Sequence, residues 1–501
     1  MKRILYQMLP RLWGNGKFSA VDAASLDYLR GLGVDYVWYT GIIRHATRKA
    51  DEGCTPSHEQ IVKGEAGSPY AITDYYDVNP YLAENPEQRM KEFLELVERT
   101  HRHGLKAILD FVPNHVARDY NSLAAPAGVR SLGADDDTSY HWSPENDFYY
   151  YPGETLRLPE PCKGNAYYEY PAKASGNCFS PSPAITDWYE TIKLNYCDFH
   201  TGTWDKMYEI VRFWAHKGVD GFRCDMVELV PASFMKWLIA RIKAEFPQVI
   251  FIAEVYEKEK YRMYVDEVGF DLLYDKSGLY DTVRAVTCDG KSACALTWNW
   301  QFLDDLQPRM LNFLENHDEQ RVASDFFAGS AEAGYAALGV ALLLNTAPFI
   351  LYFGQEVGER GMDNEPFSGL NGRTSIFDWW TVESLQALFK YIHTGKDGLS
   401  DHQKAVLDRY REALELAKRP AFSEGKTYDL GYCQKAGFNP DRHFAFLRSN
   451  GTETWLIVAN FGPDAEITIH IPTAAADYLG TSLVTPITLR VPAQDFVASR
   501  I

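Results

Sequence analysis

The sequence contains eight short apolar runs, each of which ends in polar residues and is followed by a stretch with helical spacing. This repeated pattern restricts the fold strongly. The runs lie at residues 4–10, 34–40, 105–115, 219–225, 249–255, 268–275, 309–318 and 348–356. Short β-branched or aromatic runs that alternate with helical patterns are typical of parallel strand–helix units. Eight such units predict an α/β fold, a closed (β/α)8 TIM barrel.

One intervening helix is predicted from residue 86 to residue 104. Asn85 is suited to cap it, Pro86 stands where a missing N–H costs nothing, and Gly104 follows the last turn. Its apolar positions are Met90, Phe93, Leu94 and Val97. This spacing predicts an apolar stripe that packs against the barrel.

Two segments do not follow this alternation of apolar runs and helical patterns. Residues 116–203 are a far longer connection, rich in Tyr, Pro, Gly and Asn, and predict an inserted irregular subdomain after strand three. Residues 443–460 predict two strands around Asn450-Gly451, a strong hairpin signal. We therefore predict a catalytic barrel from residues 1–115 and 204–420, subdomain B at 116–203, and a C-terminal antiparallel β-sandwich domain at 421–501.

Composition bounds the possible partners. A net charge of −18 argues against nucleic acid, and the lack of any run of 18 apolar residues argues against a membrane partner. No signal peptide is evident, so we expect a soluble cytoplasmic protein, or a periplasmic or secreted one if a leader was removed. The eight cysteines have no CxxC spacing and are expected to be mostly free thiols. The sequence does not indicate an oligomeric state.

Four strand ends carry polar segments. They read Asp110-Phe-Val-Pro-Asn114-His115, Gly221-Phe-Arg223-Cys-Asp225, Ile252-Ala-Glu254-Val255 and Phe313-Leu-Glu-Asn-His317-Asp318. In order and position they resemble the four short sequence regions of glycoside hydrolase family 13, the α-amylase family. One segment alone would be weak evidence, but four in order, with an insert after the third strand, point to that family.

The resemblance implies a retaining mechanism. Such enzymes place a carboxylate nucleophile and a protonated carboxylic acid about 5–5.5 Å apart across the scissile bond. By resemblance, Asp225 is the nucleophile and Glu254 is the general acid that later acts as base. Asp318 resembles the family's third carboxylate, which binds sugar hydroxyls. Glu254 is expected to have a raised pKa, as an acid catalyst near neutrality requires.

Four further residues match substrate-binding positions of the family. Arg223 precedes Asp225 by two residues, so both side chains point to one side of the strand and the guanidinium can hold Asp225 ionised. His115 and His317 match histidines that hydrogen-bond hydroxyls in the cleaved subsite, and Tyr70 matches a tyrosine that stacks beneath the sugar. Taken singly, these residues also suit structural roles: a buried ion pair, core histidines, a loop tyrosine. Because all four occur together with the three carboxylates, the sequence favours a substrate-binding role over these structural roles.

The sequence departs from the family pattern at three places. Family members that trim terminal glucose or act on sucrose commonly have an Asp after the stacking tyrosine, and this chain has Ala71, which favours an open cleft and internal cutting. Asn114 matches a calcium ligand of many α-amylases, but Lys193 stands where a ligating Asp would fall. A lysine would repel calcium, so we expect no metal and no cofactor. Glu228 replaces a residue next to the subsite beyond the bond, which leaves linkage preference open.

These observations predict hydrolysis of α-1,4-glucosidic bonds in starch or maltooligosaccharides by double displacement. Within the same family, the alternatives are a transglycosylase, an isomerase or an exo-α-glucosidase on short α-glucosides. A remote alternative is a catalytically silent carbohydrate-binding or scaffold protein, since fold does not imply function. That last hypothesis predicts damaged catalytic positions, and all three carboxylates are present.

Overall fold

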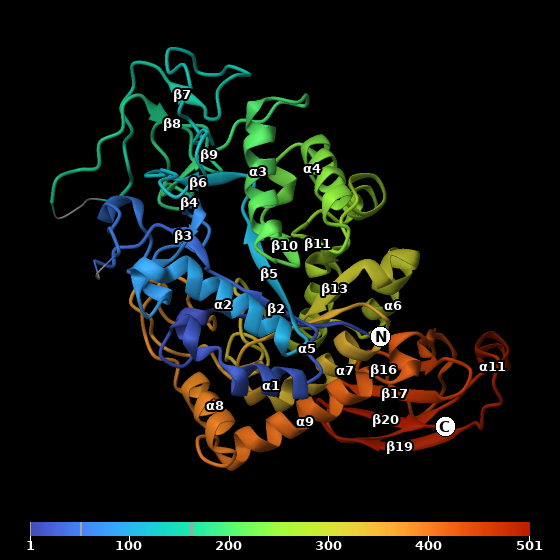
Figure 1. Cartoon of the computed structure of the whole chain (residues 1–501). Helices are drawn as coiled ribbons and strands as arrows, with labels where there is room; N and C mark the ends of the chain where they lie inside the picture. The colour runs from blue at the N-terminus through green and yellow to red at the C-terminus, as the bar shows by residue number, and fades with distance from the viewer. Residues whose placement is uncertain (1, 51–52, 161–163) are drawn as a thin grey trace.

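The computed structural model describes residues 2–50, 53–160 and 164–501. At its centre eight parallel strands close into a barrel, which confirms the predicted α/β fold (Figure 1). Each strand pairs in parallel with its neighbours, and the last pairs with the first. The strands are β1 (Ile4–Met8), β2 (Tyr36–Tyr39), β5 (Lys106–Phe111), β10 (Gly221–Cys224), β11 (Ile250–Ala253), β12 (Leu272–Tyr274), β13 (Met310–Phe313) and β14 (Phe349–Tyr352).

Helices cover the outside of the barrel. They are α1 (Ala23–Gly31), α2 (Arg89–Arg102), α3 (Gly202–His216), α4 (Ala232–Glu245), α5 (Asp281–Cys288), α6 (Cys294–Leu303), α7 (Tyr335–Leu343), α8 (Glu383–Thr394) and α9 (Asp401–Ala417). Between β11 and β12 the connection is a π-helical turn, Met263–Val268, instead of an α-helix. The strand–helix repeat is therefore complete except at this connection.

Helix α2 lies where the sequence predicts a helix, but it begins three residues later. Asn85 accepts a hydrogen bond from the backbone N–H of Glu87, which caps a 3-10 turn at Pro86–Gln88, and the α-helix starts at Arg89. Gly104 has a φ of 72°, a left-handed conformation that suits glycine after a helix. Phe93 and Val97 of the predicted stripe are buried against the core.

The connection after β5 is irregular, with short antiparallel strand pairs. β6 (His115–Ala117) pairs with β9 (Thr191–Lys193), and β7 (Tyr150–Tyr151) pairs with β8 (Ala172–Lys173). In Figure 1 this insert projects from the barrel beside α3. It leaves from the carboxyl end of β5, and its strand β6 therefore starts at the edge of the barrel where active sites are built.

The C-terminal region is a pair of antiparallel sheets. One contains β15 (Lys426–Asp429), β16 (His443–Ser449), β17 (Thr454–Asn460) and β20 (Phe496–Arg500), and the other contains β18 (Ala465–Ile469) and β19 (Ile487–Val491). The β16–β17 pair confirms the predicted hairpin. A short helix, α11 (Thr473–Leu479), lies between β18 and β19.

The larger C-terminal sheet packs against apolar residues on both of its faces. Alternate residues of a strand point to opposite sides. Residues on one face join the core of the barrel: Phe444, Phe446, Ile457, Ala459 and Phe496. Residues on the other face, Ala445, Leu447, Leu456 and Val458, form a separate core with Ile467 and Ile469 of the smaller sheet. The two regions therefore share apolar packing.

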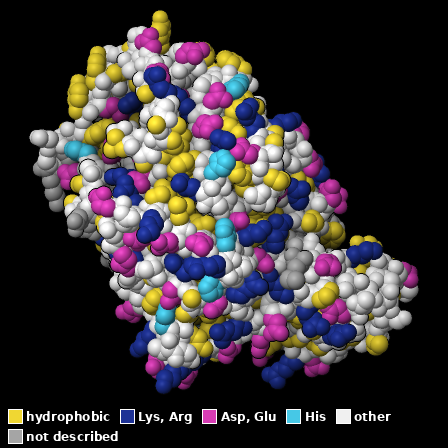
Figure 2. Space-filling view, in the orientation of Figure 1, with side chains coloured by type: hydrophobic (Ala, Val, Ile, Leu, Met, Phe, Trp, Pro, Cys, Tyr) yellow, Lys and Arg dark blue, Asp and Glu magenta, His cyan; other side chains and the backbone are white. Residues whose placement is uncertain are grey.

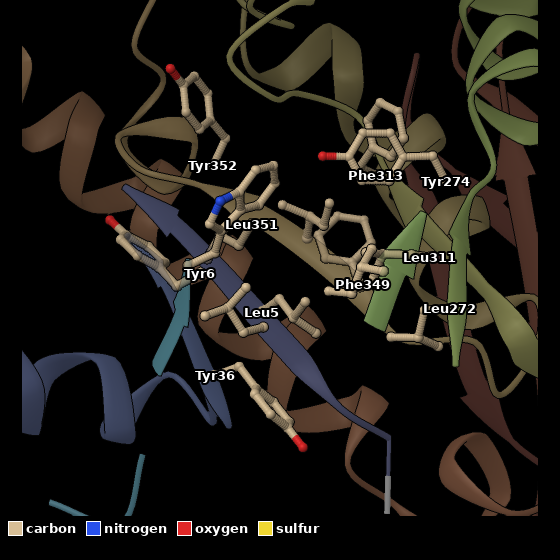
Figure 3. Packing of buried hydrophobic residues seen from close by; sticks show 14 of the residues in the cluster. Leu5, Tyr6, Tyr36, Leu272, Tyr274, Leu311, Phe313, Phe349, Leu351 and Tyr352 are labelled. Atoms are coloured by element: carbon tan, nitrogen blue, oxygen red, sulfur yellow. The ribbon is translucent and has the colours of Figure 1, made fainter. Parts of the chain in front are cut away.

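Apolar side chains fill the interior of the barrel. In Figure 3, side chains from β1, β12, β13 and β14, among them Leu5, Leu272, Leu311 and Phe349, pack together, and all four are fully buried.

Acidic and basic side chains are interspersed on the face in Figure 2. Within the described residues, none of the helices has the length and apolar character needed to cross a bilayer. The seven described cysteines are free thiols, and Cys162 lies outside the described residues.

Candidate active site

A cavity of about 340 Å³ opens at the carboxyl ends of the barrel strands. Six of the seven residues predicted from the sequence line it: Tyr70, His115, Asp225, Glu254, His317 and Asp318. The seventh, Arg223, lies directly beneath and is fully buried. The fold thus brings together residues that are up to 248 positions apart in the sequence (70 to 318).

Strand register sets Asp225 beside Glu254. In the ladder between β10 and β11, Arg223 is opposite Ile252 and Cys224 is opposite Ala253, so the next residues on each strand are Asp225 and Glu254. Because side chains alternate along a strand, Arg223 and Asp225 share one side. Cys224 points away from them and is fully buried in the barrel wall, where it contributes to packing.

Arg223 connects the acids of the site. Its Nη1 lies 2.7 Å from Asp225 Oδ1, and its Nη2 lies 2.8 Å from Glu254 Oε1. The same nitrogens approach Asp110 Oδ1 at 3.7 Å and Asp318 Oδ2 at 4.0 Å. A planar guanidinium with fixed donors orients carboxylates more strictly than a lysine can. One side chain therefore sets the relative position of the two proposed catalytic acids.

Two more groups hold Glu254. The hydroxyl of Tyr256 donates to Glu254 Oε1 at 2.8 Å, and the backbone N–H of Met226 donates to Oε2 at 2.8 Å. Met226 has a φ of 44°, which is uncommon for a residue with a side chain. Such conformations persist where the surrounding structure fixes them, often at functional sites. Here the bend turns the Met226 N–H toward the carboxylate.

The two acids interact electrostatically. Burial and the neighbouring Glu254 carboxylate raise the pKa of Asp225 well above its ordinary value, while Arg223 acts to lower it. Two carboxylates that interact this strongly lose their protons as a pair. The pair therefore retains one proton at a pH where isolated carboxyl groups have lost theirs. The pKa that rises is therefore that of Asp225, although the sequence led us to expect the Arg223 guanidinium to keep Asp225 ionised.

Asp318 lies in a second group of polar residues, in the segment that follows β13. His317 Nε2 is 3.0 Å from Asp318 Oδ2, and Gln7 Nε2 donates to His317 Nδ1 at 2.8 Å. With Nδ1 accepting, the ring carries its proton on Nε2. Although burial acts to raise the pKa of Asp318, His317 and Arg223 lower it to about 2. Asp318 is therefore ionised over the whole physiological range.

Tyr70 and His115 complete the predicted set. The Tyr70 ring stacks on the His317 ring, with centroids 5.2 Å apart and planes at 26°, and its hydroxyl lies 2.6 Å from His317 Nε2. Burial, with Lys193 and Lys63 nearby, lowers the pKa of His115 to about 3. The imidazole of His115 is neutral near pH 7, so it can hydrogen-bond a hydroxyl without adding charge.

The residues near Asn114 do not fit a calcium ion. The Lys193 ammonium donates to Asn114 Oδ1, and also to the Leu229 carbonyl at 3.3 Å. Calcium prefers several carboxylate or carbonyl oxygens, and these oxygens already face a positive charge. Among the described residues there is no group of three His, Cys, Asp or Glu side chains that could hold a metal.

Sequence reasoning missed several residues of the site. Tyr256 follows Glu254 by two positions, and the alternation rule could have placed it on the same side. Glu228, expected next to a subsite, instead accepts hydrogen bonds from the backbone N–H groups of Tyr256 and Glu257 at 2.8 and 3.2 Å. Lys63 and Glu190 also line the cavity, and they come from loops whose sequence carries no periodic signal.

Comparison with known proteins agrees with this geometry. A family model described as "Alpha amylase, catalytic domain" matches residues 16–429. The chain is 26% identical over 382 residues to Alpha-amylase 3 of Dictyoglomus thermophilum, covering 71% of this chain and 68% of that protein. It is 25% identical to Alpha-amylase MalA of Haloarcula japonica, covering 96% of this chain but only 58% of that protein. The solved structure of the cyclic α-maltosyl-(1→6)-maltose hydrolase of Arthrobacter globiformis shares the fold across the whole chain and 98% of that chain, with a TM-score of 0.67 and 18% identity.

Proposed function

Because the chain belongs to the α-amylase family of glycoside hydrolases, we propose that it hydrolyses α-1,4-glucosidic bonds of starch-like glucans and maltooligosaccharides. The proposed chemistry is a double displacement that retains the configuration of the anomeric carbon. The observation that carries the proposal is the single Arg223 guanidinium that contacts both Asp225 and Glu254 at the cavity floor.

In the first step, the Asp225 carboxylate attacks the anomeric carbon while protonated Glu254 donates its proton to the departing glycosidic oxygen. This step breaks the carbon–oxygen bond, releases the leaving sugar as an alcohol, and forms a glycosyl ester on Asp225. In the second step, the Glu254 carboxylate takes a proton from water, the water oxygen attacks the anomeric carbon, and Asp225 leaves as a carboxylate. Glu254 ends protonated, as it began.

The other polar residues are proposed to bind the sugar at the cleaved position. Asp318 is ionised and can accept hydrogen bonds from two hydroxyls, which become stronger as positive charge develops in the ring. Neutral His115 can bond a hydroxyl, and the His317 ring can bond another. Tyr70 offers an aromatic face to the apolar side of the ring. Arg223 keeps the two acids apart and oriented without touching the substrate.

Incubation with starch, pullulan, maltose, trehalose and sucrose tests the proposal. Hydrolysis of α-1,4 bonds predicts shorter maltooligosaccharides from starch and maltoheptaose. Longer or rearranged products would instead identify a transglycosylase or an isomerase. Loss of all activity on this panel would contradict the proposed function.

The proposed enzyme needs no cofactor. The support is the ammonium of Lys193, which contacts the Asn114 side chain and the Leu229 carbonyl where a calcium ion would need those oxygens. The proposed partner is the α-glucan substrate, with no nucleic acid. A soluble, cytoplasmic location remains a prediction from the sequence.

A further inference from the structure

The cavity has polar groups that the proposed mechanism does not use. Lys63, Trp188 and Glu190 line the same space as Asp225 and Glu254. Lys63 lies in the segment between β3 (Ile43–His45) and β4 (Ile72–Val78), and the other two lie just before β9 in the insert. Glu190 is almost fully buried, and its Oε2 makes no hydrogen bond, although Lys63 Nζ lies 3.0 Å away.

These groups lie on the side of the cavity that holds His115, since Lys63 is near His115 and Glu190 lies 3.0 Å from Lys63. The Trp188 ring lies 5.1 Å from the ring of His115, which belongs to the cleaved subsite. Glu254, by contrast, is surrounded by Tyr256 and Met226. The leaving sugar must lie next to the acid that protonates its oxygen. Lys63, Trp188 and Glu190 therefore face the sugars on the other side, toward the non-reducing end.

On this side, three loops are bonded into a continuous wall. Lys63 Nζ donates to the Asp187 carbonyl at 3.2 Å, which links the β3–β4 segment to the insert. Ala66 N–H donates to the Phe377 carbonyl at 2.8 Å, which links the same segment to the loop after β14. Packing there is tight, because a Cβ on Gly64 would come within 2.3 Å of that carbonyl oxygen. Ile376 and Phe377 also line the cavity.

We propose that Lys63, Glu190 and Trp188 form an end wall that binds the non-reducing end of the glucan, so that the enzyme cuts a short, fixed distance from the chain end. The ammonium and the carboxylate offer donors and an acceptor for terminal hydroxyls, and the indole offers a face for stacking. This inference rests on the proposed function and narrows it. It also opposes the open cleft that Ala71 suggested: Ala71 is buried against Ala46, Val62 and Ala117 and does not line the cavity.

The test uses two substrates that differ only at the non-reducing end. These are p-nitrophenyl maltoheptaoside and the same compound with its terminal 4- and 6-hydroxyls blocked by an ethylidene group. An end wall predicts that the wild-type enzyme cleaves the blocked compound at least tenfold more slowly. It also predicts that the unblocked compound yields one short product from the first minutes. Equal rates on both compounds, with mixed early products, would overturn the end wall and leave the proposed function intact. No cleavage of either compound would count against the proposed function itself.

Variants separate binding from folding. Lys63→Ala is expected to raise KM for the unblocked compound about tenfold while kcat changes little, because the lost contact binds the ground state and the transition state alike. The substitution should also reduce the difference in cleavage rate between the unblocked and the blocked compound. Lys91→Ala, which replaces an exposed lysine of α2, is the matched control and should change neither KM nor the rate difference between the two compounds. If Lys63→Ala leaves both KM and the preference for the unblocked end unchanged, Lys63 has no part in the wall.

Discussion

At the scale of single residues, the site depends on how Arg223 divides its donors between two acids. Its Nη1 lies closest to Asp225 and its Nη2 lies closest to Glu254, so one guanidinium orients both acids. The residues with the clearest roles are those whose type and place in the sequence both matched a family motif. Tyr256 could have been found from strand alternation, but the contacts of Glu228 are to backbone N–H groups in the turn after β11, and a sequence does not display such a turn.

Replacing Glu254 by Gln removes the proton that the leaving sugar needs. We expect activity on maltooligosaccharides to fall by roughly 10³-fold, within the range of general acid catalysis. Substrates with good leaving groups, such as glucosyl fluoride, should keep a fast first step, because they leave without protonation. Because the variant also lacks the base of the second step, the check is a pre-steady-state burst of fluoride release from glucosyl fluoride, compared with the initial rate on maltooligosaccharides. Glu95→Gln, an exposed change on α2, is the control. Full retention of starch activity in Glu254→Gln would refute the assignment.

Replacing Tyr256 by Phe removes the hydroxyl that donates to Glu254. A hydrogen bond to a charged group is worth about 1.5–3 kcal/mol, so kcat on maltooligosaccharides should fall at least tenfold. The loss should be smaller with glucosyl fluoride, which does not need the acid. Tyr140→Phe, at an exposed position, serves as control. An equal loss on both substrates would indicate a packing effect instead.

The activity should persist into the neutral pH range. The first step needs one proton on the Asp225–Glu254 pair, and burial with mutual repulsion raises the pKa of Asp225. A raised pKa means that the last proton is lost at a pH above the ordinary carboxyl range near 4. The profile of kcat/KM should therefore decline on its alkaline side, at a pH well above the ordinary carboxyl range near 4. A decline already complete at pH 5 would contradict the coupling.

At the scale of elements, the sequence predicted all eight barrel strands, because buried parallel strands appear as short apolar runs between helical patterns. It placed the start of α2 too early, since Asn85 and Pro86 form a 3-10 turn that uses the same residue types as a helix start. The packing of the insert against the β3–β4 segment could not be predicted. Those loops have no periodicity, and Lys63 and Glu190 meet only in three dimensions.

Strand β9 yields a prediction about calcium. If Lys193 supplies the positive charge that joins β9 to Asn114 and Leu229, chelators should leave the melting temperature of the wild-type protein unchanged. Lys193→Met should lower the free energy of unfolding by about 1–3 kcal/mol, because buried oxygens lose their donor. Added calcium should not restore it. Thermal unfolding with and without EDTA or calcium measures this, with Lys91→Met as control. A wild-type melting temperature that falls on chelation would contradict the proposal.

At the scale of the whole molecule, the C-terminal sheets and the barrel share a core and a buried arginine. Arg448 is 1% exposed and donates to the carbonyls of Leu344, Ala421, Phe422 and Gly425. These carbonyls lie at the end of α7 and in the junction that follows α9, so one side chain joins the two regions.

Arg448→Met should lower the free energy of unfolding by at least about 3 kcal/mol, since several buried carbonyls would lose their donor. Chemical denaturation of the full chain measures the loss. Arg490→Met, in the same region but with an arginine that is 83% exposed, should change stability little. Equal effects of the two substitutions would show that the junction does not depend on Arg448.

Asp225 is proposed to attack the anomeric carbon and to hold the sugar as an ester. The most direct measurement is peptide mapping by mass spectrometry after incubation with 5-fluoro-α-glucosyl fluoride, which forms the ester quickly and releases it slowly. One added fluoroglucosyl group is expected, on the peptide that contains Asp225. A label on a different residue, or turnover without any covalent adduct, would contradict it.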